Sequence, residues 1–171
     1  MEDYSYGNYS PFERNQSIKT VVIENGVTSI GNDAFKYSSI GDISISNTVE
    51  KIGSAAFLRS NRLREVKIPD SVTDIGVSAF SLNEDIVTVT LSKNMTQIKD
   101  STFYNCRQLV SIDIPEGILS IDKNAFFNCS SLKSVKLPNG ITNIGFESFW
   151  GCESLKQIEI PSSVTNIDEM A

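Results

Sequence analysis

Residues 132–154 read LKSVKLPNGITNIGFESFWGCES, and this pattern recurs along most of the chain at a step of 23 residues. Its opening phrase, L-x-x-(I/V)-x-(I/L)-P, begins at Leu63, Leu109, Leu132 and Leu155. Looser versions of the phrase begin at Ile18, Ile40 and Ile86. A fixed period of this length predicts a solenoid, in which each repeat, or coil, buries its apolar side chains only against neighbouring coils.

Each coil is expected to contain two short strands and a turn. Apolar and polar residues alternate from Leu132 to Leu137, which predicts a strand with one side facing inward. The Pro-Asn-Gly sequence that follows predicts a tight turn, residues 141–144 a second strand, and residues 147–152 one helical or 3-10 turn. A phenylalanine fills the core of this last segment, at Phe35, Phe57, Phe80, Phe103, Phe126 and Phe149.

We therefore expect one repeat solenoid over residues 18–171, with seven coils of which the last is incomplete. The first strands should form a parallel β-sheet on the concave face, with second short strands and helical or 3-10 turns on the other sides. The seventh coil stops at Ala171, one residue short of its expected phenylalanine, and no polar cap is recognisable there. Because an open coil exposes apolar surface and strand edges, this predicts a longer array or end-to-end self-association.

Composition argues against several classes of protein. No apolar run approaches the roughly 18 residues of a membrane span, and no charged start followed by an apolar segment indicates a secretory signal peptide. The net charge is −6 and the isoelectric point is about 4.7, whereas phosphate neutralisation requires clustered Lys and Arg. We expect no nucleic-acid partner and no membrane insertion.

Three cysteines, Cys106, Cys129 and Cys152, are each 23 residues apart and should lie in one column, that is, at equivalent positions of successive coils. A soft-metal site or a disulfide between neighbours is conceivable for such a row. Earlier coils carry Ser38, Ser60 and Asn83 at this position. The column therefore favours small, buried, weakly hydrogen-bonding turn residues, and we expect no metal.

Catalysis has little support in the sequence. The chain contains no histidine, which excludes Ser-His-Asp and Cys-His arrangements. Aspartate and glutamate are scattered over solvent-facing positions, and the recurring glycines are in register as turn residues. We expect no enzyme activity, no catalytic residue and no cofactor.

The outward positions of the first strands form the main candidate binding surface, because a parallel sheet holds such positions rigid and evenly spaced. The selected residues are charged or carry hydroxyl groups: Arg64, Glu65, Lys67, Thr88, Thr90, Ser111, Asp113, Lys133, Lys136, Lys156 and Glu159. The alternative is a self-paired ladder, in which Asp113, Lys136 and Glu159 on adjacent strands neutralise one another.

A second candidate surface is aromatic. Tyr104, Phe127 and Trp150 each follow a core phenylalanine, and Phe146 lies four residues before Trp150, close enough to join them if that turn is helical. Such a patch could stack on a sugar or take a partner's apolar side chain. Alternatively, these aromatic residues only seal the gap between coils.

The phrase L-x-x-(I/V)-x-I-P-x-x-(I/V)-T-x-I-G-x-x-A-F-x-x-C, represented by residues 109–129 and 132–152, resembles the BspA-type (Treponema pallidum-type) leucine-rich repeat of bacterial surface proteins. Residues 1–17 also resemble the segment that begins such arrays, which implies an N-terminal cap. The resemblance implies a secreted or cell-surface module, adhesin-like, that binds a protein or glycan of the host extracellular matrix or of another cell. The alternative function is a structural spacer or self-assembling scaffold element within a larger surface protein.

Overall fold

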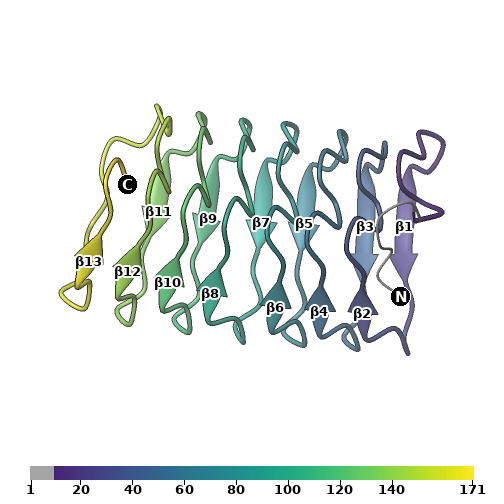
Figure 1. Cartoon of the computed structure of the whole chain (residues 1–171), viewed down its shortest axis with the longest axis horizontal. Coiled ribbons are helices and arrows are strands. Elements are labelled where there is room, and N and C mark those ends of the chain that lie inside the picture. Colours follow the sequence, from purple (N-terminus) through teal and green to yellow (C-terminus); the bar gives the residue numbers. More distant parts are fainter. Residues whose placement is uncertain (1–9) are drawn as a thin grey trace.

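The computed structural model describes residues 10–171 and confirms the predicted repeat solenoid, with coils stacked side by side along one axis (Figure 1). The first strands of the coils line one wall: β1 (Thr20–Ile23), β3 (Asp42–Ile45), β5 (Glu65–Lys67), β7 (Thr88–Thr90), β9 (Ser111–Asp113) and β11 (Ser134–Lys136). We call this wall the sheet face. Six coils therefore carry a first strand.

The second strands line another wall, and each is only two residues long. They are β2 (Ser29–Ile30), β4 (Lys51–Ile52), β6 (Asp74–Ile75), β8 (Gln97–Ile98), β10 (Ser120–Ile121), β12 (Asn143–Ile144) and β13 (Asn166–Ile167). The seventh coil forms its second strand, β13, but residues 155–161 form no first strand. All pairings are parallel and join equivalent residues, such as Ile112 with Val135.

Both walls contain a break in strand pairing. The first strands form a two-stranded sheet, β1–β3, and a separate four-stranded sheet, β5–β7–β9–β11. The second strands divide between β6 and β8 instead, into sheets of three and four strands. The third coil, residues 63–85, therefore pairs with the fourth coil only through its first strand (β5 with β7). It pairs with the second coil only through its second strand (β6 with β4).

The core is a stack of phenylalanine rings that runs through the solenoid. Neighbouring rings from Phe35 to Phe149 lie 5.2 to 5.9 Å apart between centroids and are nearly parallel. Phe57, Phe80, Phe103 and Phe126 are fully buried. The predicted core column is confirmed, and the burial of large rings against both neighbours explains why coils need to stack.

The segments around these phenylalanines are turns, and no described residue is helical, so the expectation of helical or 3-10 turns is wrong. Alternate N–H groups donate to the next coil: Phe57 N to Ala79 O over 2.8 Å, and Ala55 N to Val77 O over 2.9 Å. Ala55 and Arg59 adopt left-handed backbone conformations, with φ of 52° and 53°. N–H groups used between coils are not available for the bonds within a segment that a helix requires.

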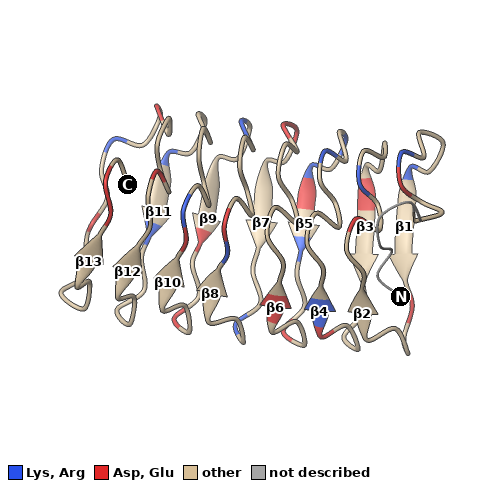
Figure 2. Cartoon of the chain, viewed as in Figure 1, with Lys and Arg blue, Asp and Glu red and all other residues tan. Residues whose placement is uncertain are grey.

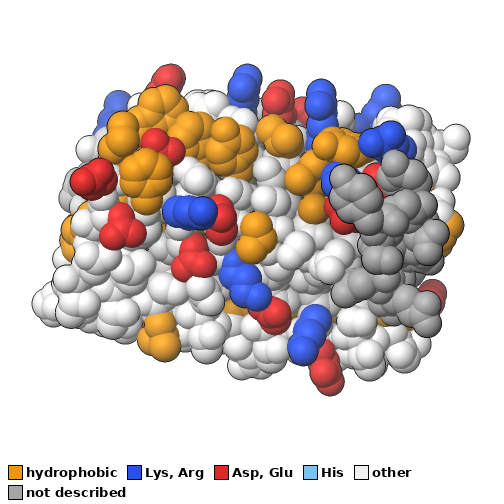
Figure 3. Space-filling model, viewed as in Figure 1, with side chains coloured by type: hydrophobic (Ala, Val, Ile, Leu, Met, Phe, Trp, Pro, Cys, Tyr) orange, Lys and Arg blue, Asp and Glu red, His pale blue; other side chains and the backbone are white. Residues whose placement is uncertain are grey.

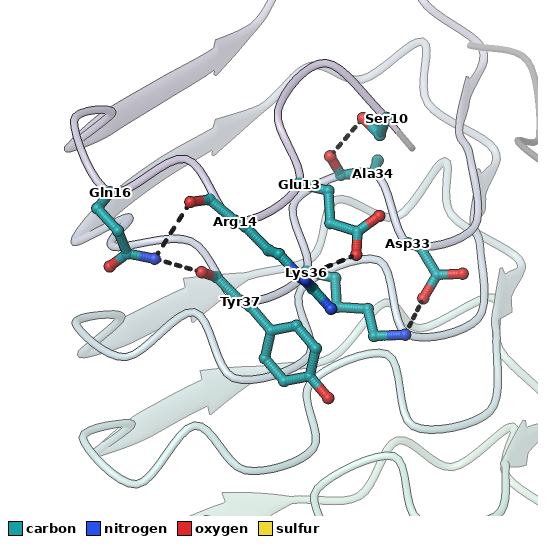
Figure 4. A network of polar contacts seen from close by, with 8 residues as sticks. All are labelled: Ser10, Glu13, Arg14, Gln16, Asp33, Ala34, Lys36 and Tyr37. Carbon is teal, nitrogen blue, oxygen red and sulfur yellow. Dashed lines mark hydrogen bonds and ion pairs between the residues drawn. The ribbon is translucent and has the colours of Figure 1, made fainter. Parts of the chain in front are cut away.

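Residues 10–17 dock on the first coil as a further repeat turn (Figure 4). Phe12 stacks on Phe35 at 5.4 Å, and Arg14 N donates to Lys36 O over 2.7 Å. Ser10 Oγ donates to Ala34 O over 2.7 Å. Sequence analysis missed Phe12 as a member of the core column, because the residues before it do not match the repeat. Residues 1–9 of the expected cap, residues 1–17, lie outside the described part of the chain.

Candidate binding surface

The sheet face presents all of its predicted residues to solvent. In each three-residue strand the outer two side chains are exposed and the central one is buried, as in Glu65-Val66-Lys67. All predicted residues of this surface are exposed: Arg64, Glu65, Lys67, Thr88, Thr90, Ser111, Asp113, Lys133, Lys136, Lys156 and Glu159. Seven of them stand on paired strands, Arg64 and Lys133 directly precede β5 and β11, and Lys156 and Glu159 lie in the strandless residues 155–161.

The charges of this surface do not neutralise one another across the sheet. Asp113 and Lys136 are register partners on β9 and β11, yet they form no ion pair within the described chain, and neither does Glu159. The one ion pair among the predicted residues of the face joins Lys67 Nζ to Glu65 Oε1 over 3.0 Å, within β5. The alternative of a self-paired ladder therefore does not form, and most of its cations have no carboxylate partner among residues 10–171.

The sheet face is hollowed at two places where strand pairing stops. One hollow, of about 530 Å³, lies between β11 and the strandless seventh coil and includes Lys133, Lys136 and Lys156. The other, which we call the notch, has a volume of about 480 Å³. It lies where β3 and β5 are unpaired, and acidic and basic residues stand side by side on these strands (Figure 2). Its lining includes Gly41, Asp42, Arg62, Arg64, Glu65 and Lys67.

Sequence analysis missed Arg62 as a member of this surface, and it placed Gly41 at an outward position of the sheet without selecting it as a binding residue. Arg62 precedes the repeat phrase, where no regular outward position is expected. Gly41 does have a signal in the sequence, because it is the one glycine in a column otherwise occupied by Lys19, Arg64, Val87, Val110, Lys133 and Lys156.

The structure brings together three of the four predicted aromatic residues. Tyr104 and Phe127 stack at 4.8 Å, and Phe127 and Trp150 stack at 4.7 Å. Trp150 is 46% exposed. Phe146 is exposed but contacts none of the other described rings, because the turn between it and Trp150 is not helical. Apolar side chains also gather along the upper edge of the face shown in Figure 3.

Stacking covers both faces of the middle ring of this row. The faces of Phe127 are covered by Tyr104 on one side and Trp150 on the other. Ring faces used between coils are not available to stack on a sugar. The row therefore helps to join coils, and Trp150 is its most exposed member.

The cysteine column forms hydrogen bonds between coils. The thiols of Cys106, Cys129 and Cys152 donate to main-chain carbonyls of the preceding coil, at 3.4, 3.2 and 3.3 Å. Ser60 Oγ and Asn83 Nδ2 bond the equivalent carbonyls in earlier coils. Burial raises the pKa of Cys106 from 9.0 to about 12, so this thiol is protonated at neutral pH and donates its hydrogen bond.

No other chemical site is visible in the described part of the chain. Within residues 10–171, no group of three Cys, Asp or Glu residues is placed to hold a metal ion. The same residues include no helix able to cross a membrane.

The sequence matches the family model described as the BspA type leucine rich repeat region, in six copies, over residues 7–129 and 50–171. Three solved structures are similar to this chain. A leucine-rich repeat protein from Eubacterium ventriosum is 26% identical, with a TM-score of 0.79 over 87% of this chain. Another from Bacteroides ovatus is 26% identical, with a TM-score of 0.74 over 94% of this chain.

The third, a leucine rich cell surface protein from Faecalibacterium prausnitzii, is 23% identical, with a TM-score of 0.56 over 81% of this chain. The present chain spans only 41%, 48% and 58% of the solved chains from E. ventriosum, B. ovatus and F. prausnitzii, about half of their length. No curated protein matches the sequence. These comparisons support the repeat fold and leave the ligand unassigned.

Proposed function

Because the chain belongs to the BspA-type leucine-rich repeat family, we propose that it is a non-catalytic binding module of a bacterial cell surface. Its ligand is a protein or a glycan of another cell or of the extracellular matrix, held on the sheet face. Display at the cell surface is supported by the description of the similar F. prausnitzii protein as a cell surface protein.

One observation carries the proposal: exposed cations stand on the first-strand sheet and at its edge without carboxylate partners. Lys133, Lys136 and Lys156 are exposed around one hollow and form no ion pair with a described residue. Charged side chains that are not paired within the molecule remain available to a partner, and regular strand spacing reduces the entropy lost on binding. A chain with a net charge of −6 that keeps these cations unpaired on one wall has a surface suited to recognition.

The test is a binding screen on an array of glycans and extracellular-matrix proteins. The wild-type chain is compared with a triple variant of the face, Lys133→Gln, Lys136→Gln and Lys156→Gln. The matched control carries Lys51→Gln, Lys93→Gln and Lys123→Gln, which removes the same charge from exposed positions outside the first strands. We expect binding by the wild type and the control and a loss of at least about tenfold in the face variant. Equal binding by all three proteins would rule out the sheet face.

A second function, self-assembly, is favoured by the apolar surface of the seventh coil. Ile160, Ile167 and Met170 are 44%, 55% and 60% exposed, and β13 has one strand neighbour among the described strands. Stacking of another chain on this surface would bury these side chains and extend the ladder. Sedimentation velocity should then show concentration-dependent oligomers that Ile167→Lys abolishes. A monomer at all concentrations would remove this candidate.

A further inference from the structure

The notch on the sheet face is produced by a local failure of strand pairing. β3 and β5 belong to separate sheets, whereas all other neighbouring first strands are paired. Ile43 and Ile45 on β3 are half-buried, although the equivalent Val66 and Ile68 are buried. The main-chain edges of β3 and β5 therefore face a hollow and are not bonded to each other in a ladder.

Gly41 deepens the notch without being needed for the fold. Its backbone is not in the left-handed region, and a Cβ added there would lie 3.7 Å from Arg62 Cβ, an ordinary van der Waals contact. Val87 and Val110 occupy this column in later coils. A side chain is therefore structurally acceptable at residue 41, and its absence leaves open the space beside Arg62 and Arg64.

The lining of the notch carries two guanidinium groups, those of Arg62 and Arg64, beside the carboxylates of Asp42 and Glu65. Neither Arg62 nor Arg64 has a hydrogen-bond or ion-pair partner for its guanidinium group among residues 10–171. Lys67, by contrast, is paired with Glu65 at 3.0 Å. A guanidinium group offers five N–H donors in a planar fork that matches a carboxylate in a two-point contact. Two such groups beside an open position form a receptor for carboxylate.

We propose that the notch binds an acidic peptide segment, whose Asp or Glu side chain enters the space over Gly41 and is held by Arg62 and Arg64. The inference rests on the proposed binding function and specifies the ligand of one part of the same face. None of the described residues that line the notch is aromatic, so this lining offers no flat surface on which sugar rings stack.

The test measures fluorescence anisotropy of a labelled oligoglutamate peptide with the full chain, at low and high salt. Gly41→Val fills the notch without changing charge, and Arg62→Gln with Arg64→Gln removes both guanidinium groups. Lys51→Gln with Lys93→Gln is the matched control, because it removes the same charge from exposed positions outside the first strands. Circular dichroism and the melting temperature establish that each variant is folded.

We expect both notch variants to weaken peptide binding by at least about tenfold, with the lysine control close to the wild type. An oligoglutamine peptide should not bind. Unchanged affinity in both notch variants, equal loss in the lysine control, or no binding of oligoglutamate would each overturn the inference. Tighter binding of polygalacturonate, a carboxylated glycan, would also overturn it. If Gly41→Val still captures the ligand found on the array, only the notch inference fails and the proposed function stands.

Discussion

At the scale of single residues, each column has one physical requirement that its members meet to different degrees. The column before the core phenylalanine requires a small apolar residue, and Ala34, Ala56, Ala79 and Ala125 meet it. Thr102 is also accommodated, because its Oγ1 donates to Lys99 O over 2.7 Å. Ser148 does not meet the requirement, because its Oγ is buried and has no hydrogen-bond partner in the described chain.

Ser148→Ala should therefore stabilise the protein. A buried unsatisfied hydroxyl costs about 1–3 kcal/mol, so its removal should raise the free energy of unfolding by about 1 kcal/mol. Urea denaturation measures the change. Thr102→Ala is the control: it removes a hydroxyl that is bonded and should lower stability. A destabilised Ser148→Ala protein would show that its hydroxyl has a partner after all.

The buried Cys106 thiol predicts a loss of stability at alkaline pH. Burial raises its pKa from 9.0 to about 12, so between these values the unfolded chain loses the proton and the folded chain keeps it. The contribution of this thiol to the free energy of unfolding is then fully present below about pH 9 and is lost as pH rises toward 12. At pH 10 the loss is about 1.4 kcal/mol. In reducing buffer, Cys106→Ser should show a shallower decline than the wild type. Parallel stability curves for the two proteins would contradict the assignment.

At the scale of elements, the turn segment is held by the next coil at the cost of backbone strain. Residues equivalent to Ala55 have positive φ in every described coil from Asp33 to Glu147, and only some are asparagine or aspartate. Left-handed backbone costs an ordinary residue roughly 1–2 kcal/mol, and asparagine less. The strain is tolerated because the segment's N–H groups then reach the carbonyls of the next coil.

Ala55→Asn should relieve part of this strain. Ala55 is half-buried with φ of 52°, and Asn124 occupies the equivalent position with φ of 57°. We expect a gain of about 0.5–1 kcal/mol in unfolding free energy, measured by thermal melting. Ala55→Val should shift the melting temperature downward, because a β-branched residue is poorly accommodated at positive φ. The same shift for both variants would show that side-chain packing, not φ, decides stability here.

At the scale of the whole molecule, stability depends on how many neighbours each coil has. Phe103 is fully buried between Phe80 and Phe126, whereas Phe149 is partly exposed and stacks on Phe126 alone among described rings. Solenoid stability is close to a sum of repeat and interface contributions. Damage in the middle of the stack should therefore cost more than the same damage in the sixth coil.

Phe103→Ala should lower the unfolding free energy by about 3–5 kcal/mol, and Phe149→Ala by clearly less. Amide hydrogen exchange shows where each protein opens. In Phe149→Ala, the loss of protection should be confined to residues around and after β12. Equal destabilisation by the two substitutions would contradict the additive description of the stack.

The sequence predicted the repeat, the core column and the exposure of the sheet face, because a strict period places equivalent residues in equivalent surroundings. It did not predict the breaks in strand pairing, since Ile40 and Leu63 keep the repeat pattern on both sides of the first break. Pairing depends on the spacing of whole coils, which no single residue specifies. The expectation of helical turn segments failed for a similar reason. The hydrogen-bond partners of these segments lie in the next coil, and the sequence of one segment does not show them.

The two breaks also determine how the molecule should respond to a pulling force along its long axis. The third coil is held to the second by β4–β6 pairing and to the fourth by β5–β7 pairing, while its other strand at each joint is unpaired. Lys99 Nζ lies 2.5 Å from Asp74 Oδ1 and reinforces the joint between β6 and β8. Under mechanical load, rupture should begin at these joints, so that the third coil separates from the block of coils before it and from the block of coils after it.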